Sequence, residues 1–178
     1  FSTENFKRPK EEVDFIFRLP KEFFKTYLKD FMENNIQVRY IGNIDMVPNF
    51  ASEVILDAVE QTKNNTGMIL CFALAYGSLD EMTQAMQNIA KDVKEGTVEL
   101  DEINESLIES YLMSADLPKL DYMIRTSGEC RLSNFMLWQM AYAEMYFTDV
   151  LWPDFDVEEF YKALDSYQKR DRRYGGIK

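Results

Sequence analysis

Residues 121–147 read DYMIRTSGECRLSNFMLWQMAYAEMYF, and this stretch carries the pattern that decides the fold. A short apolar run ends at Arg125, a turn of small polar residues follows, and Arg131 comes six positions later. We expect strands at 122–124 and 144–147, with a helix at 133–143 between them. A strand, a helix and a second strand in this order form the unit from which parallel sheets are built.

The rest of the chain repeats this alternation. Apolar runs at 38–41 and 67–74 indicate two more buried strands. Helical periodicity covers 13–34, 51–63, 80–94 and 157–170, and an Asp-Glu pair at 101–102 opens a further helix through 112. Because Pro20 interrupts the first helical stretch, we expect a kink or two helices there. The fold class is therefore α/β, with a single mostly parallel central sheet flanked by helices, in one domain over 1–178.

Composition narrows the partners. The 178 residues carry a formal net charge of -11, with 46 % hydrophobic and 29 % charged residues. We therefore expect a soluble globular protein that binds neither nucleic acid nor an anionic membrane surface. No run of 18 apolar residues predicts a transmembrane helix. Cys71 and Cys130 are not at metal-ligand spacing, and we expect a reduced, cytoplasmic compartment.

The chain contains no histidine, which limits its chemistry. Nucleophilic catalysis by Ser-His-Asp or Cys-His is excluded, and so is any His-ligated metal. A metal would have to be a hard cation held by carboxylates and phosphates, with Mg²⁺ the expected ion.

The loop after the strand at 122–124 has the composition of an anion site. Arg125 ends the strand, the Thr-Ser-Gly-Glu turn offers backbone donors, and Ser133 or Asn134 is placed to cap the next helix. Two guanidinium groups, a hydroxyl and helix-start amides suit a phosphate or diphosphate. The alternative is two surface arginines paired with Glu129 and Asp121, and spacing alone leaves both interpretations open.

The longer pattern resembles a known family. RTSGECRLSNFMLWQMAYAEMYF (125–147), followed by TDVLWPDF (148–155), is similar to the signature of the cis-prenyltransferases, in particular bacterial undecaprenyl diphosphate synthase. FSTENFKRP (1–9) resembles a second signature of that family, and RRYGG (172–176) resembles its C-terminal Arg-x-Gly motif. The resemblance runs from Phe1 to Gly176 and implies an α/β fold with a hydrophobic tunnel.

This resemblance implies repeated condensation of isopentenyl diphosphate onto an allylic diphosphate, commonly farnesyl diphosphate. The product would be a long-chain polyprenyl diphosphate such as undecaprenyl diphosphate, the lipid carrier of cell-wall glycans. The resemblance also implies Mg²⁺ as cofactor, a homodimer, and membrane contact only through the product. An apolar tunnel would shield the allylic cation and house the growing chain.

Carried over by position, the resemblance implies roles for the residues of the long motif and the C-terminus. Arg125, Arg131 and Ser133 would bind the diphosphate of isopentenyl diphosphate, and Glu144 would hold Mg²⁺. Arg173 and Gly175 would reach the same diphosphate across the homodimer. For Glu144 the alternative is an ion pair with a neighbouring arginine.

The N-terminal motif and the apolar helices receive roles in the same way. Ser2, Glu4, Asn5 and Arg8 match a loop that lies over the reacting centre, with Ser2 and Asn5 as catalytic residues and Arg8 at the allylic diphosphate. The helical stretches 15–32 and 79–89 would line the tunnel. The alternative for these apolar stripes is ordinary core packing.

The sequence departs from the family pattern at two places. The Asp-Gly-Asn-x-Arg-Trp motif, whose aspartate is the family's main Mg²⁺ ligand, would lie upstream of residue 1, together with the first strand and a phosphate-binding loop. The stretch AYGSLDE (75–81) stands where the family usually has Asn-Tyr-Gly-Gly-Arg-x-Glu. We therefore weigh a cis-prenyltransferase against a non-catalytic accessory subunit of a prenyltransferase dimer and against a phosphate-binding module without transferase activity.

Overall fold

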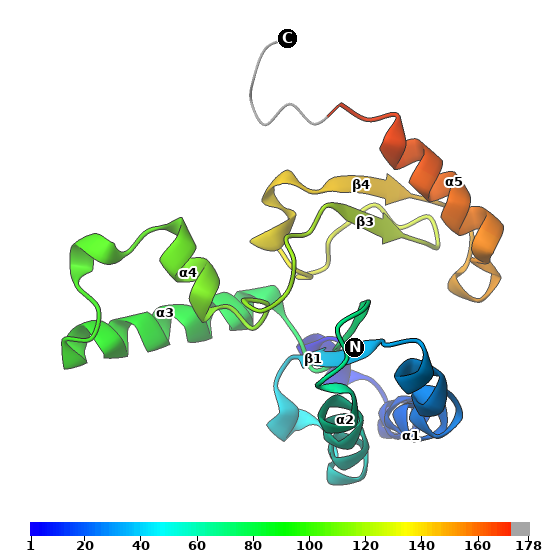
Figure 1. The fold of residues 1–178 in the computed structure, drawn as a ribbon, viewed down its shortest axis with the longest axis horizontal. Helices are drawn as coiled ribbons and strands as arrows, with labels where there is room; N and C mark the ends of the chain where they lie inside the picture. Colours follow the sequence, from blue (N-terminus) through cyan, green and yellow to red (C-terminus); the bar gives the residue numbers. More distant parts are fainter. Residues whose placement is uncertain (172–178) are drawn as a thin grey trace. The chain divides into compact units, whose positions relative to one another are not determined.

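The computed structural model describes residues 1–171, which divide into two compact units (Figure 1). Unit 1 comprises Phe1–Asp116, and unit 2 begins at Leu117. The elements of unit 1 are, in chain order, η1 (Thr3–Lys7), α1 (Lys10–Glu33), β1 (Gln37–Ile41), η2 (Ile44–Met46), α2 (Asn49–Thr62), β2 (Ile69–Ala73), α3 (Ser78–Glu95), η3 (Leu100–Glu102) and α4 (Glu105–Tyr111).

The core of unit 1 lies between α1, α2 and the parallel pair β1–β2. The register of the strands aligns Val38 with Leu70 and Ile41 with Ala73. Phe17 and Phe24 from α1 are buried against Val38 and against Ile55 from α2. Burial of such large apolar side chains stabilises the fold by about 1.5–3 kcal/mol each.

The helix α1 runs without a break through Pro20. The sequence predicted either a kink or two helices here, and the structure has one helix. A proline inside a helix removes one hydrogen bond and destabilises the helix by about 3 kcal/mol. Phe17 lies one turn before Pro20 and Phe24 one turn after it, and both enter the same core. This shared burial holds the two halves of the helix together.

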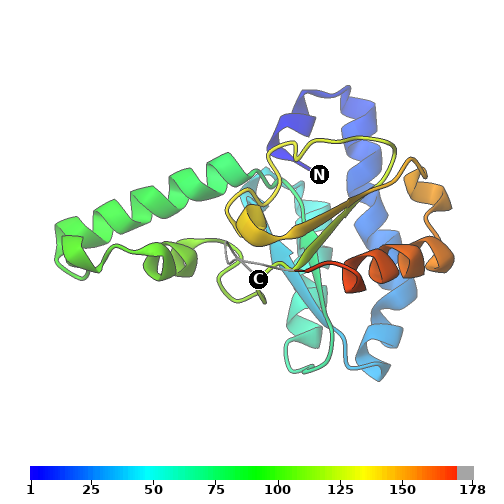
Figure 2. The same ribbon diagram turned by 90° about the horizontal axis from the view of Figure 1, so that it is seen from above.

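The helices α3 and α4 lie side by side in Figures 1 and 2. The Tyr111 hydroxyl of α4 donates to Asp92 Oδ2 of α3 at 2.5 Å. The prediction that one helix begins at Asp101 was wrong, because η3 ends at Glu102 and α4 begins at Glu105. Asn104, in an extended conformation, caps α4 by accepting the Leu107 amide at 3.0 Å and so sets its start.

Unit 2 contains β3 (Tyr122–Arg125), η4 (Gln139–Tyr142), β4 (Glu144–Phe147), η5 (Trp152–Asp154) and α5 (Val157–Gln168). The strands β3 and β4 pair in parallel, with Tyr122 opposite Glu144 and Arg125 opposite Phe147. The Tyr122 hydroxyl donates to the Ala163 carbonyl at 2.9 Å, which ties α5 to the strands.

The predicted helix at 133–143 is absent, and only the short η4 forms within that range. Ser133, Asn134 and Met136 have φ angles of 52°, 59° and 47°, in the left-handed region. A right-handed helix cannot pass through three such residues. The segment therefore connects β3 to β4 as a chain of turns, and no helix N-terminus is present at Ser133.

The four predicted strands are confirmed, and both pairs are parallel as expected for an α/β fold. Within residues 1–171, each unit has one pair of strands. The single central sheet and the single domain over 1–178 stay predictions, as does the apolar tunnel. In the described part of the chain, residues 1–171, no helix is both long and apolar enough to cross a membrane.

Candidate active site

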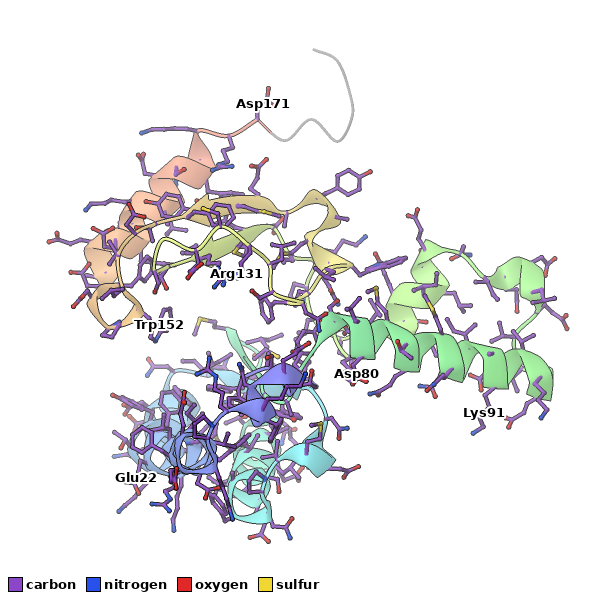
Figure 3. All side chains as sticks on the ribbon, turned by 180° about the vertical axis from the view of Figure 1, so that it is seen from behind. Glu22, Asp80, Lys91, Arg131, Trp152 and Asp171 are labelled. Carbon is purple, nitrogen blue, oxygen red and sulfur yellow. The ribbon has the colours of Figure 1, made fainter. Side chains whose placement is uncertain are left out.

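Three of the predicted ligands for isopentenyl diphosphate gather on one loop of unit 2. Arg125 ends β3, and its Nη1 donates to the carbonyl oxygen of Arg131 and to Ser133 Oγ at 3.4 Å. Figure 3 labels Arg131 on this loop. Arg125 thus contacts the backbone of Arg131 and the side chain of Ser133, while the role of these three residues as diphosphate ligands stays a prediction. We call residues 125–133 the arginine loop.

The backbone amides of the turn have another role than the one expected from sequence. The Ser127 amide donates to the Val150 carbonyl at 2.8 Å, and the Gly128 amide donates to the Thr148 carbonyl at 2.9 Å. These bonds join the arginine loop to the segment after β4. With no helix beginning at Ser133, the side chains rather than these amides remain the candidate anion-binding groups of the loop.

Gly128 is required by the path of this turn. Its φ is +68°, and a Cβ at this position would lie 3.0 Å from Asp149 Oδ1. Any other residue would therefore meet both backbone strain and a close contact. The turn places the arginine loop beside the segment that follows β4.

Arg131 is largely exposed and forms an ion pair with Glu129 through Nη1. The alternative interpretation of the loop was two surface arginines paired with Glu129 and Asp121, and this pair is the one with Glu129. Exposed ion pairs contribute at most about 1 kcal/mol. A diphosphate, with several charge-assisted acceptors for a guanidinium, competes readily with a single carboxylate for Arg131.

Glu144 lies at the start of β4, away from the end of β3 that carries Arg125. The register pairs Arg125 with Phe147, so three residues, or roughly 10 Å of strand, separate Glu144 from the position opposite Arg125. Glu144 Oε2 accepts a hydrogen bond from Arg170 Nη1 at 2.7 Å, and Arg170 Nη2 donates to the Met145 carbonyl at 2.8 Å. The structure therefore joins Glu144 to Arg170 and not to the arginine loop.

Sequence reasoning missed Arg170. Within the basic run at 169–173, the family resemblance assigned a role to Arg173 alone. The available signal was Glu144 itself, because an ion pair between Glu144 and a neighbouring arginine was the alternative to its role as a metal ligand. Arg173 and Gly175 themselves lie outside the described residues.

The predicted N-terminal site residues lie on and beside η1 in unit 1. The Ser2 amide donates to Asn5 Oδ1 at 2.8 Å, and the Asn5 amide donates to the Ser2 carbonyl at 3.1 Å. These reciprocal bonds bring Ser2 and Asn5 together. They also leave the nitrogen end of the Asn5 carboxamide as the part of that side chain suited to donate to a phosphate oxygen.

Arg8 follows η1 and forms an exposed ion pair with Glu12 at 2.5 Å. Glu4 lies within η1, and its Oε2 accepts a hydrogen bond from the Thr3 hydroxyl at 3.2 Å. Arg8 is therefore available to an anionic ligand in the same way as Arg131, at the expense of a weak surface pair.

The carboxylates of the described residues limit how a metal ion could be bound. Within 1–171, no three or more Asp, Glu or Cys side chains are grouped so as to hold a metal ion. Mg²⁺ is often bound through one or two carboxylates together with substrate phosphates and water. Glu144 fits that donor chemistry as one carboxylate, provided that the ion displaces Arg170 from it.

Comparisons with known proteins place the chain in a family. The family model described as "Putative undecaprenyl diphosphate synthase" matches residues 1–175. The isoprenyl transferase of Halalkalibacterium halodurans is 54 % identical over 177 residues, which are 99 % of this chain and 69 % of that protein. The isoprenyl transferase of Bacillus subtilis is 53 % identical over 177 residues, which are 99 % of this chain and 68 % of that protein.

Solved structures agree with the sequence relatives. Lavandulyl diphosphate synthase from Lavandula x intermedia, in complex with dimethylallyl diphosphate, matches with a TM-score of 0.94 and 37 % identity, over 98 % of this chain and 76 % of that one. A "probable undecaprenyl diphosphate synthase" from Campylobacter jejuni matches with a TM-score of 0.83 and 38 % identity, over 98 % of this chain and 80 % of that one.

These relatives are enzymes, and none of them supports the interpretation as a non-catalytic accessory subunit. A family match over nearly the whole chain, together with more than half of the residues identical to an isoprenyl transferase, leaves one assignment. The chain belongs to the undecaprenyl diphosphate synthase family of cis-prenyltransferases.

Proposed function

We propose that this chain condenses isopentenyl diphosphate onto farnesyl diphosphate, with cis geometry, to give a long-chain polyprenyl diphosphate such as undecaprenyl diphosphate. The observation that carries the proposal is the gathering of Arg125, Arg131 and Ser133 on the arginine loop. Two guanidinium groups and a hydroxyl within one loop match the charge and the acceptors of a diphosphate.

In this proposal the arginine loop binds isopentenyl diphosphate. Arg131 exchanges Glu129 for the diphosphate, and the Ser133 hydroxyl adds a neutral donor. Arg125 has two functions, because its contact with the Arg131 carbonyl fixes the loop while its charge attracts the ligand. Such preorganised donors lose little free energy on rearrangement when the ligand binds.

The N-terminal loop, residues 2–8, would serve the allylic diphosphate. Arg8 would exchange Glu12 for a phosphate oxygen, and Ser2 and Asn5 would orient the reacting groups. Departure of diphosphate from the allylic carbon leaves negative charge on the leaving group, which a guanidinium stabilises. Exposed apolar side chains of α1 and α3, namely Phe15, Leu19, Leu79 and Met86, are the candidates for the lining of an apolar tunnel.

Mg²⁺ is the proposed cofactor, with Glu144 as its protein ligand. When bound, the ion would neutralise phosphate charge and assist departure of the diphosphate. To bind the ion, Glu144 would exchange its contact with Arg170 for the metal. A homodimer, in which Arg173 and Gly175 reach the partner's diphosphate site, is part of the same proposal.

A prenyl-transfer assay tests this function. Purified chain is mixed with farnesyl diphosphate, labelled isopentenyl diphosphate and Mg²⁺, and butanol-extractable label is measured. The same assay is run with the chain preceded by a family-type Asp-Gly-Asn-x-Arg-Trp segment. Long-chain product from either version is the expected result. Absence of product from both versions would contradict the proposal.

A further inference from the structure

We propose that the buried hydrogen bond between Tyr76 and Glu81 positions the N-terminal loop, residues 2–8, for prenyl transfer. Both side chains belong to unit 1, and the proposed mechanism assigns no role to either of them. The inference rests on the proposed function for its catalytic consequence, while its structural part stands by itself.

The N-terminal segment is attached to the Tyr76 backbone by hydrogen bonds on both sides of Ser2. The Thr3 amide donates to the Tyr76 carbonyl at 3.3 Å, and the Tyr76 amide donates to the Phe1 carbonyl at 3.3 Å. Ser2 and Tyr76 consequently form an isolated parallel bridge. The nitrogen of Phe1 also donates to the Ala73 carbonyl, at the end of β2, at 3.0 Å. The position of Ser2 thus follows the position of the Tyr76 backbone.

Glu81 fixes the side chain of Tyr76. The Tyr76 hydroxyl donates to Glu81 Oε2 at 2.5 Å, and the two residues are only 3 % and 1 % exposed. A carboxyl group buried so deeply is tolerated only where hydrogen bonds compensate the loss of water. The Tyr76–Glu81 hydrogen bond is therefore part of the interior of unit 1 and not a surface contact.

The location of Glu81 adds a second stabilising contribution. Glu81 lies in the first turn of α3, next to Asp80, which Figure 3 labels. The N-terminal end of a helix favours negative charge. The Glu81 amide also donates to the Gly77 carbonyl at 2.9 Å, which fixes Glu81 in the first turn of α3. The hydrogen bond from Tyr76 to Glu81 therefore ties the Tyr76 ring to the start of this helix. The N-terminal loop, which contains Ser2 and Asn5, is anchored through the Tyr76 backbone to the start of α3.

A separate contact keeps the segment folded when the Tyr76 hydroxyl is removed. The ring of Phe1 packs edge-on against Phe6 at 5.0 Å and against Phe17 at 4.9 Å between centroids. This aromatic packing does not involve Tyr76. Loss of the Tyr76–Glu81 bond should therefore loosen the register of residues 2–5 without detaching the segment. That makes Tyr76 and Glu81 positioning residues.

Hydrogen exchange tests the structural part directly. In Tyr76→Phe, the amides of residues 1–9 should exchange about tenfold faster than in the wild type, as expected for loss of one buried hydrogen bond. Residues 37–41 of β1 should exchange at the wild-type rate. Glu81→Gln, which keeps the size of the side chain and an acceptor oxygen, should show a smaller increase in the same peptide.

Tyr111→Phe is the matched control, because it removes a Tyr–carboxylate hydrogen bond of the same 2.5 Å length, to Asp92, elsewhere in unit 1. It should leave exchange of residues 1–9 unchanged. Unchanged exchange of 1–9 in Tyr76→Phe, or an equal increase in Tyr111→Phe, would overturn the proposal. This readout needs no activity, so it remains decisive even where the proposed function fails.

Steady-state kinetics tests the catalytic consequence. Tyr76→Phe should lower kcat and raise KM for farnesyl diphosphate, while KM for isopentenyl diphosphate and the melting temperature stay near the values of Tyr111→Phe. A general loss of stability would instead shift both KM values or the melting temperature. Faster exchange of residues 1–9 with undiminished kcat would overturn the link between the pair and prenyl transfer.

Discussion

Arg125 donates a hydrogen bond from Nη1 to the main-chain carbonyl oxygen of Arg131, six residues along the chain. One proposed ligand of the diphosphate therefore holds the backbone of another. The same nitrogen lies 3.4 Å from Ser133 Oγ, so the three proposed ligands form one connected group. The turn between Arg125 and Arg131 brings the chain back, so that the Arg125 side chain reaches the Arg131 carbonyl six residues later.

Replacing Arg131 should affect ligand binding far more than folding. Arg131→Ala removes only an exposed ion pair with Glu129 from the folded protein, but it removes a charge-assisted contact from the complex. We expect isopentenyl diphosphate to bind about 1.5–3 kcal/mol more weakly. Isothermal titration calorimetry measures this difference. Lys162→Ala, which removes an exposed pair with Glu159 in the same unit, is the control, and equal affinity in Arg131→Ala and wild type would reject the assignment.

Glu144→Gln tests the proposed metal ligand. An amide keeps the size and one acceptor of the side chain but loses the charge that a hard cation prefers. The Mg²⁺ concentration for half-maximal prenyl transfer should rise at least about tenfold. Arg170→Gln, which releases Glu144 from its partner, should not raise that concentration. If the two variants show the same Mg²⁺ dependence as wild type, Glu144 serves only the ion pair.

Ala75→Gly should stabilise the protein. Ala75 has a φ of 52° and is buried, with 1 % of its surface exposed. A left-handed conformation destabilises a non-glycine residue by about 1–2 kcal/mol. Part of this is offset by the greater entropy of glycine in the unfolded chain, so we expect a net gain of about 0.5–1 kcal/mol.

Urea unfolding measures the change in free energy for Ala75→Gly. Ala58→Gly is the matched control, since Ala58 is also buried but lies inside α2, where the same substitution should destabilise by about 1 kcal/mol. Destabilisation by both substitutions would contradict the left-handed assignment of residue 75.

The two cysteines should differ in reactivity. Burial raises the pKa of the Cys71 thiol to about 11, with a smaller opposing effect of Arg39, whereas Cys130 is exposed. A thiol with that pKa is thiolate in only about one molecule per thousand at pH 8. Iodoacetamide at pH 8 should therefore label Cys130 first, as read by peptide mass spectrometry, and labelling of Cys71 should accelerate as pH rises towards 11. Equal labelling of both at pH 8 would refute the burial of Cys71.

Burial of Tyr40 gives the fold a dependence on alkaline pH. Burial, followed by the charge of Asp45, raises the pKa of Tyr40 to about 12, from an ordinary value near 10. A raised folded-state pKa means that this contribution to stability is complete below pH 10 and disappears as pH rises towards 12. Tyr40→Phe should show a flatter dependence of the urea midpoint on pH in this window. An identical dependence in both proteins would contradict it.

The strands and most of the helices follow from sequence because burial and periodicity are local. The strand at 144–147 was predicted with its observed bounds, and α2 and α3 were predicted within two residues at either end. The apolar periodicity of these segments agrees with their packing. The grouping of Arg125, Arg131 and Ser133 was predictable for the same reason, since all three lie on one short loop.

The failures have physical causes. Residues 133–143 have a helical composition, but left-handed conformations at Ser133, Asn134 and Met136 are set by the path of the chain and not by propensity. The contact between Glu144 and Arg170 joins residues 26 positions apart and depends on where α5 ends. A further example of backbone set by the path of the chain is position 75, where the family usually has asparagine. Asparagine tolerates left-handed backbone, and this chain has Ala75 there instead.

The most direct test of the central claim is prenyl transfer by the wild type and by the double variant Arg125→Ala/Arg131→Ala, measured side by side. Farnesyl diphosphate, labelled isopentenyl diphosphate and Mg²⁺ are supplied to whichever version of the chain is active, and extractable product is quantified. We expect long-chain product from the wild type. From the double variant we expect at least about a hundredfold less product, at unchanged circular dichroism, because donors to the diphosphate are lost. Equal product from both would contradict the claim that the arginine loop binds isopentenyl diphosphate.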